Sequence, residues 1–259
     1  MRLEDLKTDE RIFALFKGDP KTGKSIAAHS FHFGEPVYTF DLDARMESVL
    51  AFYTKFGKLP NVEYDRFTDF FSIHQKLEEL KQYCPYRLVV LDSLSALAFK
   101  SIQTMIDTRT PSDKNKIKDR GGIVLSMVED FGGEANAIRM VMDNLLTISL
   151  RHNVSVIVTA HVITPESGAY RPMRTLLTGG KKIAAEIPIN FNEAYHFFVQ
   201  TSGGMDMSDS NIARQYIAVT RTIGTDWAAT ALPIPDIIDF TDTLLYQRVL
   251  EEIDKSKPA

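Results

Sequence analysis

Short apolar runs alternate with stretches of helical periodicity through the first two thirds of the chain. Buried strands appear as continuous apolar runs, whereas amphipathic helices repeat their apolar positions every three to four residues. This pattern predicts strands at residues 12–16, 37–42, 61–67, 87–91 and 154–160. It predicts helices at residues 23–32, 45–56, 70–83 and 135–152. Strands that alternate with helices indicate an α/β fold, in which helices cover both faces of a mostly parallel sheet.

The pattern changes after residue 189. Residues 192–201 and 214–222 predict late antiparallel strands on either side of a turn rich in Gly, Asp and Ser. An amphipathic helix is expected near the end of the chain, at about 243–255. No internal repeat or low-complexity linker interrupts these elements, so residues 1–259 are expected to form a single domain.

The composition of the chain is ordinary for a globular protein. It has 259 residues, of which 44% are hydrophobic and 25% charged, and its net charge of −4 gives no global attraction to nucleic acid. A single cysteine, Cys84, excludes an internal disulfide framework and suits a reducing compartment. No apolar run approaches the roughly 20 residues that cross a bilayer, and the N-terminus is too acidic for a signal peptide. We therefore expect a soluble cytoplasmic protein with no membrane partner.

The strongest chemical signal is the pattern G-x-x-x-x-G-K-[ST], placed after the first predicted strand and before a helix. Its residues are Gly18, Asp19, Pro20, Lys21, Thr22, Gly23, Lys24 and Ser25. In this context the N–H groups of the loop face phosphates, and the helix N-terminus adds partial positive charge. Lys24 would reach the β- and γ-phosphates, and the Ser25 hydroxyl would coordinate Mg²⁺. The pattern predicts a P-loop for a nucleotide, ATP with Mg²⁺; the alternative is a chance match in a surface turn.

Three further strands end in polar residues at the edge of the sheet where open α/β folds bind ligands. Asp92 follows an apolar strand and suits Mg²⁺ coordination, although a helix N-cap is the alternative and Ser93 could supply that cap instead. Asp43 is expected to position the attacking water, with Asp41 structural, unless both cap the next helix. His161 could sense the γ-phosphate and pass its presence to the following loop, or be a structural histidine.

These pieces, in this order, resemble the RecA-like ATPase core over approximately residues 11–225. The sequence at 88–97 is similar to the Walker-B strand of that family. The sequence Phe-Asp-Leu-Asp at 40–43 is similar to the strand that ends in its catalytic carboxylate, where the family usually has glutamate. The resemblance places His161 where the family commonly has a glutamine sensor that leads into a DNA-binding loop. Thr-Gly-Gly at 178–180 resembles the segment that closes this loop.

Within this superfamily the chain is most similar to short phage-encoded RecA-like proteins that bind nucleotide or anneal single strands. The likeness rests on residues 18–25, on Thr-Ala-His at 159–161 and on Gly-Lys-Lys-Ile-Ala-Ala-Glu-Ile-Pro at 180–188. It implies a DNA-stimulated ATPase that acts on single-stranded DNA in phage recombination, by annealing or strand exchange, in the host cytoplasm. It also implies a homo-oligomer, a filament or ring, and a single-strand-binding protein as a further partner. A hexameric helicase or translocase motor and a nucleotide-dependent assembly switch are the alternatives.

Two long polar stretches, 101–133 and 162–182, fit neither the strand nor the helix pattern, and loops of this length are usually functional. They carry two basic clusters that could contact DNA phosphates: Lys114, Lys116, Lys118 and Arg120, and Arg171, Arg174, Lys181 and Lys182. Tyr170 could stack on a base, and solvated charge on surface loops is the alternative for both clusters. The resemblance further implies that Arg221 reaches the γ-phosphate of a neighbouring subunit, unless it is a surface arginine. Trp227 either packs in the core or contacts adenine.

Overall fold

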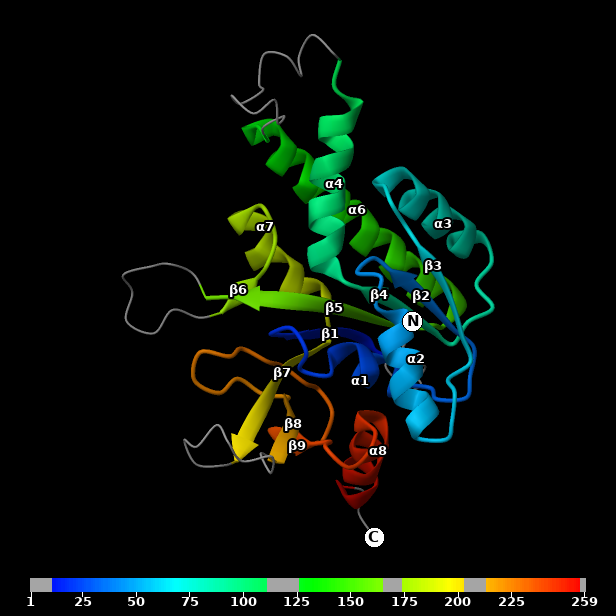
Figure 1. Ribbon diagram of the computed structural model, residues 1–259, viewed down its shortest axis with the longest axis vertical. Helices are drawn as coiled ribbons and strands as arrows, with labels where there is room; N and C mark the ends of the chain where they lie inside the picture. The colour runs from blue at the N-terminus through cyan, green and yellow to red at the C-terminus, as the bar shows by residue number, and fades with distance from the viewer. Residues whose placement is uncertain (1–10, 111–125, 165–173, 203–212, 257–259) are drawn as a thin grey trace, which may run out of the picture.

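The computed structural model describes residues 11–110, 126–164, 174–202 and 213–256. Their strands form one mixed sheet in the order β3-β2-β4-β5-β1-β7-β8-β9, and the short β6 pairs with β5 (Figure 1). The strand bounds are β1 Phe13–Gly18, β2 Val37–Asp41, β3 Val62–Arg66, β4 Leu88–Asp92, β5 Ser155–Ile163, β6 Thr175–Leu176, β7 Glu193–Ser202, β8 Ala213–Val219 and β9 Ile237–Asp239. The helix bounds are α1 Lys24–Ser30, α2 Met46–Lys55, α3 Phe70–Gln82, α4 Leu94–Thr108, α6 Val128–His152, α7 Lys181–Glu186 and α8 Leu245–Ser256, and the 3₁₀ helix η2 is Ile187–Asn190.

The pairing of the strands confirms the predicted α/β architecture. Strands β3, β2, β4, β5, β1 and β7 run parallel, whereas β8 and β9 continue the sheet in antiparallel pairs. Parallel neighbours need a crossover, and helices α1 to α6 supply most of these connections. All carboxyl ends of the parallel strands therefore meet at one edge of the sheet, where polar side chains that follow them can gather.

Helices cover both faces of this sheet, which is why its central strands are apolar on both sides. On one face α3, α4 and α6 pack against alternate residues of the strands, such as Leu15, Leu91 and Val158. On the other face α1 and α8 pack against the residues between them, such as Phe16 and Val90. Figure 1 shows α3, α4 and α6 on one side of the sheet and α1, α2 and α8 on the other.

The long polar stretch 101–133 is partly helical, which the sequence analysis did not predict. Helix α4 continues to Thr108 and α6 already begins at Val128. Gly133 lies inside α6, and a Cβ on it would lie 2.2 Å from the Sδ atom of Met105 on α4. The glycine thus allows two helices to pack closely instead of ending one of them. Strand β9 was also missed, because its three residues are too short to give a periodic signal.

Candidate functional site

The loop 18–25 connects β1 to α1 through two backbone conformations that favour glycine. Gly18 has φ 155°, and a Cβ on it would lie 2.2 Å from the carbonyl oxygen of Phe197 on the adjacent strand. Gly23 has φ 85° and directly precedes the first helical residue, Lys24. The two glycines of the sequence motif are therefore required by the backbone itself, and they turn the loop over the N-terminus of α1.

Lys24 lies inside this loop and is almost completely buried. Its Nζ atom donates hydrogen bonds to the carbonyl oxygens of Gly18 at 2.9 Å and Asp19 at 2.7 Å. Burial lowers the pKa of Lys24 from 10.5 to about 8, although the charges of Asp92 and Asp19 oppose the shift. The side chain thus carries a positive charge at neutral pH inside a loop between a strand and a helix, where it can attract an anion.

Asp92 ends β4 and is buried with its carboxylate against the neighbouring strand. The hydroxyl of Thr159 on β5 donates a hydrogen bond to its Oδ1 atom. The N-cap of α4 is supplied by Ser93 instead, whose Oγ atom accepts a hydrogen bond from the amide of Ala96 at 3.2 Å. Asp92 is therefore not the cap of α4. Thr159 fixes its orientation, and the sequence analysis did not single out Thr159.

The two carboxylates at the end of β2 have different surroundings. Strand β2 ends at Asp41, so Asp43 lies beyond the strand. Asp41 accepts hydrogen bonds from the amides of Arg45 at 2.8 Å and Met46 at 3.3 Å, at the start of α2. Asp43 instead approaches His161, with 3.7 Å between its Oδ2 atom and the Nε2 atom of the ring. Asp41 is thus a helix anchor, whereas Asp43 faces the carboxyl end of β5.

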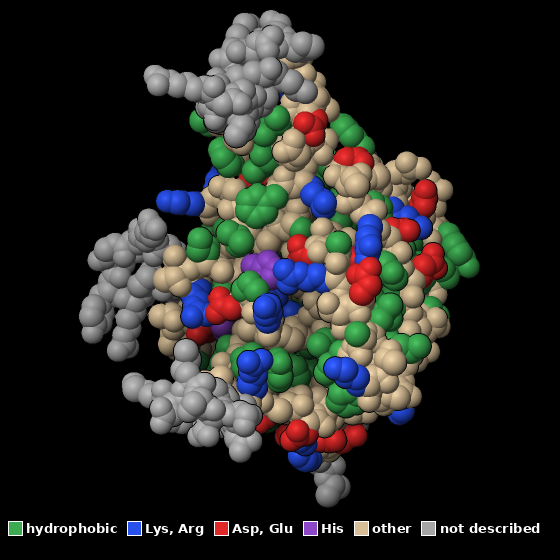
Figure 2. All heavy atoms as spheres, in the orientation of Figure 1, with side chains coloured by type: hydrophobic (Ala, Val, Ile, Leu, Met, Phe, Trp, Pro, Cys, Tyr) green, Lys and Arg blue, Asp and Glu red, His purple; other side chains and the backbone are tan. Residues whose placement is uncertain are grey.

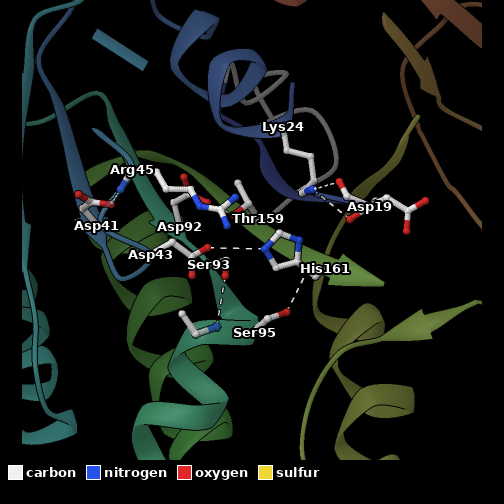
Figure 3. A network of polar contacts seen from close by, with 12 residues as sticks. Asp19, Lys24, Asp41, Asp43, Arg45, Asp92, Ser93, Ser95, Thr159 and His161 are labelled. Carbon is white, nitrogen blue, oxygen red and sulfur yellow. Dashed lines mark hydrogen bonds and ion pairs between the residues drawn. The ribbon is translucent and has the colours of Figure 1, made fainter. Parts of the chain in front are cut away.

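His161 is held by its backbone on both sides. Its amide donates to the Oγ atom of Ser95 on α4 at 3.0 Å, and its carbonyl oxygen accepts from the amide of Leu177 at 2.8 Å. Figure 3 shows the ring between Asp43 and the loop that carries Lys24. Burial alone would raise the pKa of Asp43, but the His161 ring and the Ser93 hydroxyl stabilise its charged form, so the net shift lowers this pKa below its usual value.

These residues border one cleft of about 520 Å³ at the carboxyl edge of the sheet. Its lining includes five residues that the sequence analysis selected from four separate segments: Lys24, Ser25, Asp43, Asp92 and His161. The space-filling view shows Lys and Arg side chains over the middle of this face, with apolar side chains between them (Figure 2). The residues that the sequence analysis selected at separate strand ends therefore lie around one cleft.

A smaller apolar pocket adjoins this cleft, and the two share Gly23, Ile26 and Tyr216 in their linings. Its other walls come from α2 and from the segment between β9 and α8, including Phe52, Phe240 and Leu244. The sequence analysis missed this pocket, because its aromatic side chains come from segments that only the fold brings together. Trp227 lies elsewhere, with its ring 4.1 Å from the Nζ atom of Lys17.

A buried polar cluster lies beneath the other side of the loop 18–25. Lys17 has its Nζ atom 3.3 Å from Nδ1 of His196, and Nε2 of His196 lies 3.3 Å from Asp226. Burial lowers the pKa of Lys17 to about 7 and, together with Lys17 and Arg174, that of His196 to about 3. Arg174, expected to contact DNA, is engaged here: it lies 3.0 Å from the carboxylate of Asp19 and 3.7 Å from that of Asp226.

The remaining basic residues have different positions. Lys181 and Lys182 are exposed at the start of α7, and Lys182 lies 3.8 Å from Glu186. Arg221 pairs with Asp236 of its own chain at 2.6 Å. Tyr170 and five of the basic candidates for DNA contact lie outside the described residues. These five are Lys114, Lys116, Lys118, Arg120 and Arg171.

Neither a known protein-family model nor a curated protein matches this chain. Within the described ranges, no group of three or more His, Cys, Asp or Glu side chains could hold a metal ion. A Mg²⁺ site of the kind predicted needs only one carboxylate and one hydroxyl beside bound phosphates. No helix in the described part of the chain has the length and apolar character to cross a bilayer.

Proposed function

We propose that the chain binds ATP with Mg²⁺ in the cleft beside the loop 18–25 and hydrolyses it. The observation that carries the proposal is the convergence of Lys24, Asp43, Asp92 and His161 on one cleft. A buried cation in a glycine loop suits phosphate, and carboxylates next to it suit a metal ion and a water molecule. The order of these residues along the chain supports a RecA-like ATPase.

The residues of the cleft fit the chemistry of phosphoryl transfer. Lys24 and the loop amides would bind the phosphates, and Ser25 and Asp92 would hold Mg²⁺, for which oxygen ligands are the preferred donors. When bound, Mg²⁺ neutralises charge on the phosphate oxygens. The lowered pKa of Asp43 keeps its carboxylate ionised at neutral pH, so it can accept a hydrogen bond from the attacking water and orient it.

The apolar pocket next to the cleft would take the base of the nucleotide. It lies at the first turn of α1, directly beside the glycine loop, through the shared residues Gly23 and Ile26. The aromatic rings of Tyr216 and Phe240 lie 6.1 Å apart by their centroids and offer faces on which a purine can pack. Substitution Tyr216→Ala should weaken binding of ATP more than binding of inorganic triphosphate.

The proposed macromolecular substrate is single-stranded DNA in phage recombination, where the protein would anneal or exchange strands. The resemblance to RecA-like proteins supports this, together with the exposed cations Lys181 and Lys182 on α7, which lies beside the carboxyl end of β5 (Figure 1). The protein would act as a filament or ring, with Arg221 reaching the nucleotide of a neighbouring copy once its pairing with Asp236 opens. A single-strand-binding protein would be a further partner.

The deciding experiment measures ATP turnover with and without single-stranded DNA. Wild type should hydrolyse ATP and be stimulated by DNA, whereas Lys24→Ala and Asp43→Asn should lose turnover. Lys58→Ala, which removes an exposed charge away from the cleft, is the matched control. Turnover that DNA does not change would refute the recombinase function and favour a nucleotide-dependent assembly switch. Equal turnover by wild type and Lys24→Ala would refute the ATPase itself.

A second experiment tests the DNA surface on α7. The double substitution Lys181→Ala and Lys182→Ala should weaken binding to single-stranded DNA and reduce its salt dependence. Because each phosphate contact on a single strand contributes about −0.7 to the slope of log K against log[salt], the slope should change by about 1.4. The control Lys55→Ala with Lys58→Ala removes the same charge elsewhere. An unchanged slope in the α7 variant would contradict this surface.

A further inference from the structure

Glu134 on α6 is a buried carboxylate that the proposed reaction does not use. Its Oε1 atom accepts a hydrogen bond from the amide of Gly179 at 2.8 Å, and its Oε2 atom has no hydrogen-bond partner among the described residues. Burial raises the pKa of Glu134, while the amides of Gly179 and Gly180 oppose the shift. A buried carboxylate with so few partners destabilises a fold, so its presence calls for a compensating role.

The turn that Glu134 binds packs closely against α6 and α4 at Gly179, where a side chain would be crowded. A Cβ at Gly179 would lie 2.6 Å from the Oε2 atom of Glu134 and 2.8 Å from Cδ1 of Ile102 on α4. A Cβ added at Gly180 would lie 3.6 Å from the same Oε2 atom. The turn therefore packs against both helices, and the backbone amide of Gly180 also stabilises the charged form of Glu134.

This turn continues directly into the segment that holds His161. Two residues before Gly179, the amide of Leu177 donates to the carbonyl oxygen of His161 at 2.8 Å. Figure 1 shows β6 and α7 beside the carboxyl end of β5, with α6 next to them. One of the two backbone hydrogen bonds of His161 thus depends on a segment whose other end is anchored by Glu134. In the other bond, the amide of His161 donates to the Oγ atom of Ser95 on α4.

We propose that Glu134 is a positioning residue for His161. By anchoring the Gly179 turn to α6, it fixes the Leu177–His161 hydrogen bond and directs the His161 ring toward Asp43 in the nucleotide cleft. A carboxylate suits this task because it only accepts hydrogen bonds and faces backbone N–H groups, and a charged acceptor binds them more strongly than a neutral one. The inference rests on the proposed function, since it assigns Glu134 to the same site.

The kinetic test compares Glu134→Ala, Glu134→Gln and the exposed control Glu129→Ala on the same helix. Glu134→Ala should lower kcat for ATP by about 10- to 100-fold with little change in KM, as expected when a side chain in the site is slightly displaced. Glu134→Gln retains an acceptor oxygen and should recover most of the activity. Glu129→Ala should match wild type. An equal loss in kcat and in nucleotide affinity, or no rescue by glutamine, would overturn the proposal.

A double substitution separates positioning from a general loss of structure. In a His161→Ala background, Glu134→Ala should cause no further loss of kcat, because the residue that it positions is already gone. Additive losses would overturn the proposal, since they would mean that Glu134 acts independently of His161. Such cycles are the direct measure of coupling between two residues.

The side-chain NMR resonances of His161 test the same point without turnover. In Glu134→Ala these ring resonances should move toward those of the Asp43→Asn protein, in which the contact of the ring with the Asp43 carboxylate is lost. Unchanged ring resonances would overturn the positioning role. If wild type does not hydrolyse ATP at all, the proposed function fails, and the resonances still decide whether Glu134 positions His161.

Discussion

Substitution of Thr159 by valine tests whether Asp92 is a fixed metal ligand. Both side chains are buried, with exposed fractions of 0% for Thr159 and 4% for Asp92, and the threonine hydroxyl donates to the carboxylate. Valine keeps nearly the same shape but replaces the donor with a methyl group. The Asp92 oxygen then stays buried without this partner, and the loss of a hydrogen bond to a charged group costs about 1.5–3 kcal/mol.

Two measurements check this prediction. Urea unfolding without nucleotide should show the loss of about 1.5–3 kcal/mol in the free energy of unfolding. The Mg²⁺ concentration needed for half-maximal nucleotide binding should rise by about 10- to 100-fold, because a ligand that loses its orienting partner binds metal more weakly. The control is Thr147→Val, whose exposed hydroxyl bonds to the carbonyl of Asp143 within α6 and whose loss should change stability by no more than about 0.5 kcal/mol. Equal stability and equal Mg²⁺ dependence of the two variants would refute the role of Thr159.

Three further predictions concern the buried Lys17, two glycines in different surroundings, and the two carboxylates at the end of β2. The folded-state pKa of Lys17 is lowered from 10.5 to about 7, so the unfolded chain holds the extra proton between these values. From Lys17 alone, stability should therefore rise with pH in this window by at most about 1.4 kcal/mol per unit. Lys24, whose pKa is about 8, adds a rise of its own, so Lys17→Met should reduce but not abolish the difference in the free energy of unfolding by urea between pH 7.5 and 9.5. An equal difference in wild type and Lys17→Met would contradict this prediction. Gly18→Ala should destabilise the fold by about 3 kcal/mol, because the new Cβ would clash with a β7 carbonyl. Gly132→Ala, which has open space around it, should stabilise the fold by up to about 1 kcal/mol. A higher melting temperature for Gly18→Ala than for Gly132→Ala would contradict this prediction. Asp41→Asn should lower the free energy of unfolding by about 1 kcal/mol and leave ATP turnover unchanged. Asp43→Asn should leave the free energy of unfolding unchanged and abolish turnover. The opposite pattern would contradict the roles given to the two carboxylates.

Much of the site could be predicted because strand ends obey a simple geometric rule. Each apolar run that ends in Asp or His marks one carboxyl end of a parallel sheet, and all such ends lie on one edge. Asp43, Asp92 and His161 followed from this rule, and Lys24 followed from the pattern at 18–25, without knowledge of the contacts between them. The backbone conformation of the loop glycines could also be predicted, because a short turn between a strand and a helix demands unusual backbone angles.

The remaining parts depend on contacts between distant segments. Nothing near Arg174 indicates that its side chain meets Asp19, which lies 155 residues earlier in the chain. Tyr216 and Phe240 border the apolar pocket only because β8 and β9 pair beside α1. No local pattern explains Gly133 inside α6, whereas the packing of α6 against Met105 does. Single-sequence patterns report local preference and burial, but they do not report which surfaces meet.

The central claim is that the loop 18–25 binds the phosphates of a nucleotide through Lys24. The most direct test is an equilibrium titration of wild type and Lys24→Ala with a fluorescent ATP analogue in the presence of Mg²⁺. Wild type should bind the analogue saturably. Lys24→Ala should bind it at least about tenfold more weakly, because the lost charge-assisted contact contributes about 1.5–3 kcal/mol. Equal affinity of the two proteins, or no binding by wild type, would contradict the assignment.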